Sequence, residues 1–247
     1  MNVSVFFQSL KQMGGIIALE HRYHGNLPDI RNCRLCAEYS LPFKGKWVVV
    51  NGGISKRTSH SWDIPTQRYA YDFVILDAEG KSFHGPEADP SSFYCYGKDI
   101  LAPADGVVAE VSAGQPDSRI TARREAVCDA RDIRGNYILL FHAENEHSLL
   151  AHLKPGSILV SVGQTVKRGQ KIAQCGNSGN TSEPHLHFQL QQGRSFYTSP
   201  GLPIQFADIY VQDTSRYEVF DDRGLYIPGK SSYPPYIEIG QTVSNQK

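Results

Sequence analysis

The chain contains one closely spaced pair of histidines, His185 and His187, within the segment His185–Leu190. In a β-strand, side chains at positions i and i+2 lie on the same face. The spacing therefore directs both imidazoles to one side and Leu186 and Phe188 to the other. Neutral imidazole is a good zinc ligand, and a catalytic zinc site typically has three protein ligands and one open position. The pair predicts part of a metal site whose remaining ligands lie elsewhere in the chain.

Three other polar residues, His60, Asp72 and His152, are the candidates for those ligands. Asp72 lies inside the run Tyr69–Ile75, where burying a carboxylate costs free energy unless it is paired or bound to a metal. His152 lies near the end of the apolar run Leu149–Leu153. A single such residue is more often a hydrogen-bonded core residue or a turn cap, but four in one β-rich region favour a metal site. The remaining histidines lack such surroundings and are expected at the surface: His21, His24, His84, His142 and His147.

The segments that must position these residues resemble short β-strands. From Lys46 onward, β-branched and aromatic runs alternate with Gly, Pro, Asn and Asp, which is typical of an all-β domain. Two longer stretches, Asp77–Tyr96 and Ser112–Arg134, are predicted to be inserted loops, which in compact domains tend to be functional or disordered. The predicted strands are Trp47–Val50, Tyr71–Leu76, Gly106–Val111, Asn136–Phe141, Ser148–His152, Lys171–Gln174 and His185–Leu190.

The two ends of the chain are less regular. Ser9–Leu19 has the pattern of one short helix, although Gly14 and Gly15 weaken a helix interior. We expect residues 1–45 to pack on a main domain at 46–195, followed by a C-terminal extension and polar tail at 196–247. Within that extension the expected pieces are strands at Ile209–Val211 and Tyr236–Ile239 and a frayed tail at Gln241–Lys247.

The composition excludes several classes of protein. The chain has 247 residues, of which 40% are hydrophobic and 20% charged, as in an ordinary folded protein. Lys plus Arg and Asp plus Glu number 25 each, so no overall field favours nucleic acid. No apolar run approaches the roughly 18 residues of a membrane span, and no export signal is recognisable at the N-terminus.

Five cysteines, Cys33, Cys36, Cys95, Cys128 and Cys175, cannot all pair within one chain, so at least one thiol stays free. The Cys33-x-x-Cys36 motif lacks a second half that would complete a structural zinc site. We interpret it as an incidental pair or a local disulfide.

Several motifs follow one another in an order that resembles the lysostaphin/LytM-type zinc endopeptidases. The resemblance extends from about Trp47 to Leu190, which is more than half of the chain. The motifs are, in order, His60, Asp72, the Gly-x-Val at Gly106, Gly135-Asn136-Tyr137-Ile138, Ala151-His152-Leu153, the glycine-containing run Val162–Gln170, Gly176-Asn177-x-Gly179 and His185-x-His187.

This resemblance implies an all-β fold with an antiparallel two-sheet or partly open barrel core. It implies one zinc ion per chain, held by His60, Asp72 and His187, with His152 and His185 as the catalytic pair. The implied activity is hydrolysis of peptide bonds in bacterial peptidoglycan, in a glycine-rich bridge or in a stem-peptide crosslink. Such a substrate suggests the cell envelope or the exterior, whereas the lack of a visible leader leaves the cytoplasm open. The oligomeric state is not predicted.

One departure from the family pattern concerns His60. Many members separate the first histidine and the aspartate by only a few residues, whereas His60 and Asp72 are 12 positions apart. The tight turn expected at Asn51-Gly52-Gly53 offers a way to return His60 to the side of Asp72.

Three other functions fit parts of the pattern. Ala102–Val108 and Val162–Gln170 also resemble the hairpins of biotinyl and lipoyl domains, but no lysine-bearing tip of the Met-Lys-Met kind lies between them. A histidine phosphocarrier of related fold would use paired histidines without needing His60 and Asp72. A catalytically inactive LytM-like regulator would bind cell wall without metal, although here all five candidate positions are filled.

Overall fold

The computed structural model of the chain describes residues 3–224 and 236–246. A long helix, α1 (Val3–Tyr23), precedes a series of strands, with a short 3-10 helix η1 (Pro90–Ser92) and a short helix α2 (Tyr217–Phe220) between them. The strands are β1 (Trp47–Asn51), β2 (Tyr71–Val74), β3 (Asp99–Leu101), β4 (Gly106–Ser112), β5 (Asn136–Ala143), β6 (Glu146–Leu153), β7 (Thr165–Val166), β8 (Lys171–Gln174), β9 (Leu186–Gln191), β10 (Gly201–Leu202), β11 (Ile209–Asp213) and β12 (Gln241–Asn245).

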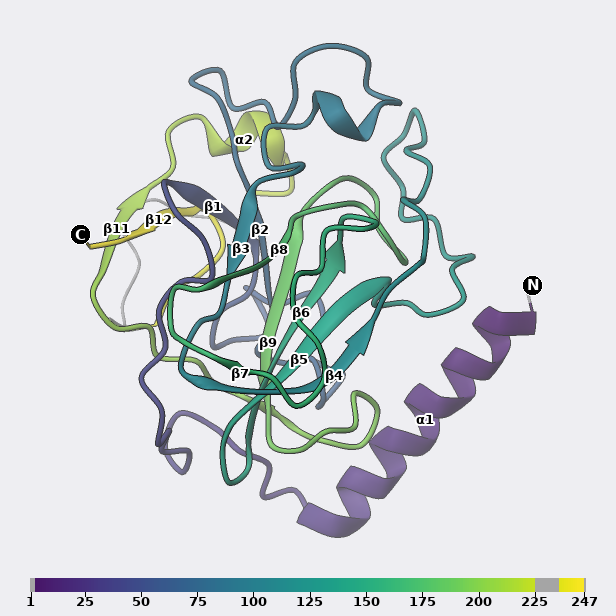
Figure 1. Ribbon diagram of the computed structural model, residues 1–247, viewed down its shortest axis with the longest axis vertical. Coiled ribbons are helices and arrows are strands. Elements are labelled where there is room, and N and C mark those ends of the chain that lie inside the picture. The colour runs from purple at the N-terminus through teal and green to yellow at the C-terminus, as the bar shows by residue number, and fades with distance from the viewer. Residues whose placement is uncertain (1–2, 225–235, 247) are drawn as a thin grey trace.

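Most strands belong to one large antiparallel sheet. Its order is β11-β12-β1-β2-β9-β6-β5-β4-β7, with β10 paired to β9, and β3 and β8 form a separate small sheet. Figure 1 shows the small sheet lying against the middle of the large one, with α1 along one side of the molecule. The predicted all-β, antiparallel two-sheet fold with long loop insertions is confirmed. Both sheets are open, so the described residues form no closed barrel.

The main core is built from alternate side chains of the central strands. On β2 and β9, Tyr71, Phe73, Leu186 and Phe188 are buried in one hydrophobic cluster, to which Ile172 of β8 also belongs. Successive side chains of a strand point to opposite faces, so the residues between them emerge on the other side of the large sheet. Burial of the aromatic residues thereby determines which side of β2 and β9 is available for chemistry.

The N-terminal helix is longer than the sequence predicted. It continues through Gly14 and Gly15, because Gly15 packs directly against the backbone of Tyr197. A Cβ atom on Gly15 would lie 1.8 Å from the Tyr197 carbonyl oxygen. The glycine thus permits a close approach of α1 to the Tyr197 backbone, and this packing offsets the low helix propensity of glycine. The side of α1 that faces away from the domain carries the exposed apolar residues Phe6, Leu10, Met13 and Ile17.

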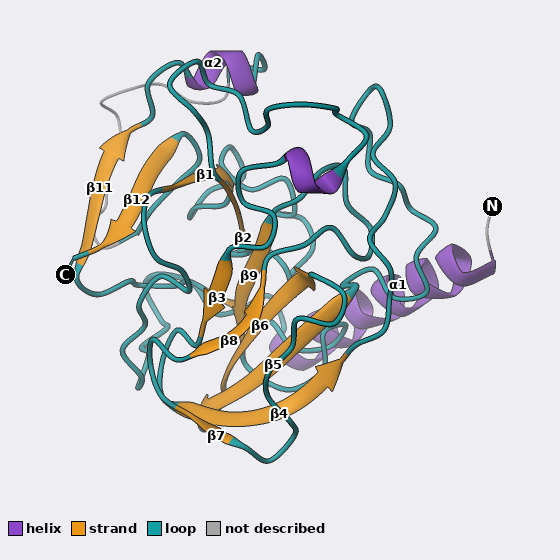
Figure 2. Ribbon diagram, turned by 45° about the horizontal axis from the view of Figure 1, so that its top comes forward, coloured by secondary structure: helices purple, strands orange, loops and turns teal. Residues whose placement is uncertain are grey.

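The expected frayed tail is wrong. Residues Gln241–Asn245 form β12, which pairs with β1 on one side and β11 on the other (Figure 2). The predicted strand at Ile209–Val211 is present within β11, whereas the described residues 236–239 precede β12 without being a strand. β12 is polar because backbone pairing holds it, with Val243 as its one apolar side chain in the main core.

The segment that follows α1 is attached to the domain through a buried carboxylate. Glu146, at the start of β6, accepts hydrogen bonds from the backbone amides of Cys36 and Ala37 and from the Tyr39 hydroxyl. All five cysteines are free thiols in the structure, so the strap formed by residues 33–39 depends on these hydrogen bonds rather than on a disulfide. No helix among the described residues is long and apolar enough to cross a membrane.

Replacing Glu146 with alanine is expected to lower the free energy of unfolding by roughly 3 kcal/mol, because two amides and a hydroxyl lose a charged acceptor at once. Urea denaturation measures the change. The matched control is Glu144→Ala, two residues away on an exposed turn, which should change stability by less than about 0.5 kcal/mol. Equal effects of the two substitutions would contradict the role assigned to Glu146.

Candidate functional site

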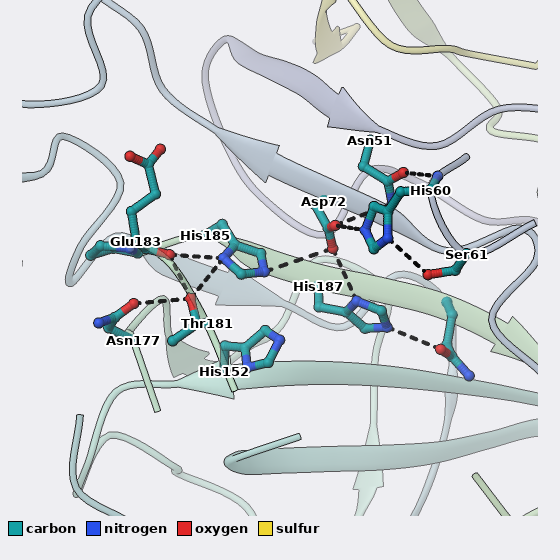
Figure 3. Close-up of polar contacts among 12 residues, drawn as sticks. Asn51, His60, Ser61, Asp72, His152, Asn177, Thr181, Glu183, His185 and His187 are labelled. Carbon is teal, nitrogen blue, oxygen red and sulfur yellow. Dashed lines mark hydrogen bonds and ion pairs between the residues drawn. The ribbon is translucent and has the colours of Figure 1, made fainter. Parts of the chain in front are cut away.

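Asp72 and His187 lie opposite each other on the neighbouring strands β2 and β9. Their side chains emerge on the same face, and His187 Nδ1 lies 3.0 Å from Asp72 Oδ1 (Figure 3). Asp72 is 8% exposed, so its carboxylate is removed from water and depends on these neighbours. Strand register alone therefore brings together two residues that are 115 positions apart in sequence.

His60 reaches the same carboxylate from the loop between β1 and β2. Its Nε2 lies 3.2 Å from Asp72 Oδ2, and its backbone amide donates to the side chain of Asn51. The Asn51 amide group donates in turn to Asp72 Oδ2 over 3.1 Å. Gly52 has a φ of +123°, and a Cβ there would lie 2.3 Å from the Tyr71 ring, so the turn requires glycine. Asn51 and the turn after it thus bring His60 back beside Asp72, although the two residues are separated by 12 positions in sequence.

His152 joins the group through an unusual backbone conformation. Ala151 pairs with His187 and faces the site, so strict alternation would direct His152 into the core. Instead His152 has a φ of +59°, in the left-handed region that non-glycine residues rarely adopt. Its ring lies 4.6 Å from that of His185 and 5.8 Å from that of His187, measured between centroids. All five candidate residues therefore meet in one place.

Hydrogen bonds determine which nitrogen of each of two rings carries the proton. His152 Nδ1 lies 2.8 Å from the carbonyl oxygen of Ser178, and His185 Nδ1 lies 2.8 Å from that of Glu183. A carbonyl oxygen can only accept, so Nδ1 is the protonated nitrogen in both rings. Nε2 then carries the lone pair, and in His185 it lies 3.8 Å from Asp72 Oδ1.

His187 is in the opposite situation, because both of its nitrogens face acceptors. Nδ1 faces Asp72, and Nε2 lies 2.9 Å from Gln189 Oε1. The orientation of the Gln189 amide is fixed because its nitrogen donates to the carbonyl oxygen of Thr66. His187 is therefore an imidazolium in this arrangement, with one proton on each nitrogen.

The charge states of these groups follow from burial and from Asp72. Burial alone would raise the pKa of the Asp72 carboxyl, but hydrogen bonds from His187 and His60 hold that pKa well below its usual range. Burial would lower the pKa of His187, yet Asp72 raises it above the ordinary value. Burial lowers the pKa of His185 despite Asp72, and it lowers that of His152 strongly, with the neighbouring histidines adding to the effect. Two rings are therefore neutral at pH 7.

The donor set matches what a zinc ion requires. Two imidazoles and one carboxylate are typical ligands of a catalytic zinc, and protons now occupy the space between Asp72 and the His187 and His60 rings. The 3.0 and 3.2 Å separations are close to the roughly 3.3 Å between two ligand atoms of a tetrahedral zinc site. Within residues 3–224 and 236–246, however, no three His, Cys, Asp or Glu side chains already surround a common point. The residues fit the ion chemically.

The site lies between two cavities. One, of about 400 Å³, is lined by His152, His185 and His187 and by apolar residues such as Ile64 and Phe196. The other, of about 530 Å³, shares His60, Asp72 and His185 with the first and is lined further out by charged residues, including Arg124, Glu183 and Asp222. Because they share these residues, the two cavities adjoin at the site, and together they are called the groove.

Of the two predicted loops, only one lines this groove. Residues of the 112–134 segment, among them Arg124 and Ile133, contribute to both cavities. The 77–96 segment contributes no lining residue to either cavity and instead supports Arg124 from behind, through Glu87 and Phe83.

Sequence reasoning missed the residues that orient the site, among them Asn51, Gln189 and Ser178. Gln189 follows His187 by two positions, so the i and i+2 rule that identified the histidine pair also placed it on the same face. The hydrogen bond from His152 to the Ser178 carbonyl left no signal, because any residue type supplies a backbone carbonyl. The expectation that His147 lies at the surface is wrong, since it is buried against Phe141, away from the groove.

Known proteins resemble the part of the chain that contains three of these histidines. Residues 92–198 match the model of peptidase family M23. This range includes His152, His185 and His187, but it begins after His60 and Asp72. An uncharacterised metalloprotease of Haemophilus influenzae is 33% identical over 126 residues, which is 51% of this chain and 21% of that protein. The peptidoglycan DD-endopeptidase ShyA of Vibrio cholerae is 43% identical over 56 residues, which is 23% of this chain and 13% of ShyA.

Among solved structures, the catalytic domain of the prophage-encoded M23 protein EnpA from Enterococcus faecalis is 18% identical and aligns with a TM-score of 0.42. The alignment covers 67% of this chain and 95% of that domain. The two curated relatives are much longer than their matched segments, so this chain corresponds to about a fifth or less of each.

In metal-free protein at pH 6.5, we expect long-range proton–nitrogen NMR to find His187 protonated on both nitrogens and His152 protonated on Nδ1 alone. The pKa of His187 lies above its ordinary 6.5, so the charged form dominates at that pH. The pKa of His152 lies well below 6.5, so the neutral form dominates. A neutral His187 or a charged His152 at pH 6.5 would refute the hydrogen-bond assignment.

Proposed function

We propose that this chain is a member of peptidase family M23, whose model matches residues 92–198, and that it is a zinc-dependent endopeptidase that hydrolyses peptide bonds in bacterial peptidoglycan. The observation that carries the proposal is the meeting of a buried Asp72, flanked by His60 and His187, with the neutral rings of His152 and His185 in one groove. The proposed substrate is that of the relative ShyA, a peptidoglycan DD-endopeptidase. We propose action in the cell envelope for the same reason.

In this proposal His60, Asp72 and His187 hold one zinc ion per chain. When bound, zinc acts as a Lewis acid that makes water a better nucleophile and polarises the carbonyl group of a peptide bond. Asp72 contributes the single negative charge of the ligand set. Gln189 keeps the Nε2 proton of His187 in place, so that Nδ1 is the nitrogen free to act as a ligand once its proton is lost.

His152 and His185 supply the proton transfers. Each holds a proton on Nδ1 against a backbone carbonyl and presents the Nε2 lone pair, and each has a lowered pKa. A neutral ring of this kind can accept the proton that the attacking water loses. The same ring, once charged, can stabilise the oxyanion and deliver its proton to the leaving amine.

Two rival functions make different predictions for the same protein. A catalytically inactive cell-wall-binding regulator would bind wall material without holding zinc or releasing amines. A histidine phosphocarrier would form phosphohistidine at His152 or His185 and would not need Asp72. The observed pairing of Asp72 with two histidine side chains favours the metal-dependent hydrolase over the phosphocarrier.

The direct test combines metal content by mass spectrometry with release of new amines from purified peptidoglycan. We expect about one zinc ion per wild-type chain, and loss of both zinc and activity in His187→Ala, because three protein ligands are the usual minimum for a catalytic site. His84→Ala, which alters an exposed histidine outside the groove, is the control and should retain both. A metal-free wild type that binds wall material would favour the regulator.

His152→Ala separates catalysis from metal binding. We expect it to retain zinc and to lower kcat by about a hundredfold or more, the usual contribution of a general acid or base. The control is His147→Ala, which removes a buried histidine at the other end of the same strand that lines neither cavity. Loss of zinc in His152→Ala, or an equal loss of kcat in His147→Ala with its fold intact by circular dichroism, would argue against the assigned role.

A further inference from the structure

Glu183 has a carboxylate that the site as described does not use. The residue is 6% exposed and lines the 530 Å³ cavity. Its Oε2 accepts hydrogen bonds from the Ser82 hydroxyl and from Arg124 Nη1, whereas Oε1 is buried without a hydrogen-bond partner. Buried polar atoms of native proteins nearly always have a partner, and a buried charged acceptor without one is costly. Oε1 therefore marks a position at which a donor is missing.

The charges around Glu183 indicate that the missing donor is a cation. Within the part of the chain that the structure describes, Arg124 is the one cation paired with Glu183, and it also pairs with Glu87, so one positive charge is shared by two carboxylates. Burial raises the pKa of the Glu183 carboxyl even though Arg124 opposes the shift, which means that the arginine does not fully compensate for lost solvation. A second cation at Oε1 would balance the cluster.

Arg124 is not free to supply the missing contact. Its guanidinium lies 4.7 Å from the centre of the Phe83 ring, and both of its terminal nitrogens already donate to carboxylates. Its backbone has a φ of +49°, in the left-handed region, which only surrounding contacts can maintain. The arginine is therefore built into the wall of the cavity, and it leaves Oε1 of a cavity-lining carboxylate without a donor.

Glu183 is also close to the chemistry. Its backbone carbonyl accepts the Nδ1 proton of His185, while its side chain points away from that ring (Figure 3). The cavity that Glu183 lines is lined as well by His60 and Asp72. A peptide whose scissile bond lies at the histidines would thus extend along this cavity toward the carboxylate.

We propose that the Glu183 carboxylate is a subsite for a primary ammonium group of the peptide substrate, on the side of the scissile bond that occupies the larger cavity, with a rotation of the side chain bringing the unpaired Oε1 to the ligand. The subsite rests on the proposed function to the extent that the ligand is a cell-wall peptide. It selects amine-bearing peptides, since an ammonium group both donates a hydrogen bond and supplies the missing charge. Acetylating the amine removes the charge and enlarges the group.

The test measures binding, so that it does not depend on turnover. The probes are soluble peptide fragments of purified peptidoglycan, used untreated or after acetylation of their amines with acetic anhydride. Binding is measured by calorimetry in the His152→Ala background, because His152 does not line this cavity. We expect the untreated fragments to bind about tenfold more tightly or better, the usual value of a charged hydrogen bond. Equal binding of the two probes would overturn the subsite, whatever the activity of the wild type.

Glu183→Gln, added to the same background, keeps the shape of the side chain and removes its charge. We expect the two probes then to bind within about twofold of each other. The matched control is Asp222→Asn, which removes an equal charge from an exposed residue of the same cavity and should keep most of the preference, since exposed charges are screened. A preference that survives Glu183→Gln, or that is lost equally in Asp222→Asn, contradicts the proposal.

The two proposals fail separately. In one outcome, the wild type holds no zinc and releases no amines but shows a Glu183-dependent preference for untreated fragments. This result supports the subsite and refutes the endopeptidase activity. In the other outcome, the wild type contains zinc, hydrolyses peptidoglycan and binds both probes alike. This result supports the endopeptidase activity and refutes the subsite. A thermal unfolding curve shows whether Glu183→Gln folds. If it does not, the binding of the two probes to the His152→Ala variant alone still tests the subsite.

Discussion

The site depends on the burial of one carboxylate. Asp72 lies in a strand whose neighbouring side chains, Tyr71 and Phe73, are fully buried in the main core. A carboxylate in such a place is tolerated only with hydrogen-bonded or charged partners, and Asp72 has them from three segments of the chain. His187 approaches from β9, His60 from a loop, and Asn51 from the end of β1. The strand order β1-β2-β9 is what makes these contacts possible.

A second constraint is the placement of protons by acceptors that cannot donate. Two backbone carbonyls fix His152 and His185 in the same tautomer, whereas Asp72 and Gln189 keep His187 doubly protonated. The centre of the His152 ring lies within 6 Å of the centre of each of the other two rings, yet the three rings differ in charge because their outer partners differ. This division suits two neutral rings for proton transfer and leaves the third beside the carboxylate, where a cation is favoured.

The loop between β4 and β5 connects this chemistry to selection of a ligand. It has no helix and no strand of the sheets, and it is held in place by contacts with other segments, such as those of Arg124 with Glu87 and Glu183. Its residues line both cavities, so a change in the loop alters what can lie beside the histidines without altering the histidines themselves. The sheet, which positions the histidines, and the loop, which lines the cavities, thus have separate roles.

The sequence by itself determined the all-β class, most of the strand positions and the five candidate residues, because alternation along a strand and the cost of a buried charge are local properties. It did not determine that β12 belongs to the sheet, since Gln241–Asn245 gains its stability from backbone pairing with distant strands. Only the tertiary structure decided that His152 turns toward the groove through a left-handed backbone, and that Asn51 and Gln189 orient the ligand candidates. Those outcomes depend on contacts between segments far apart in the chain, which leave no periodic signal in the residues that make them.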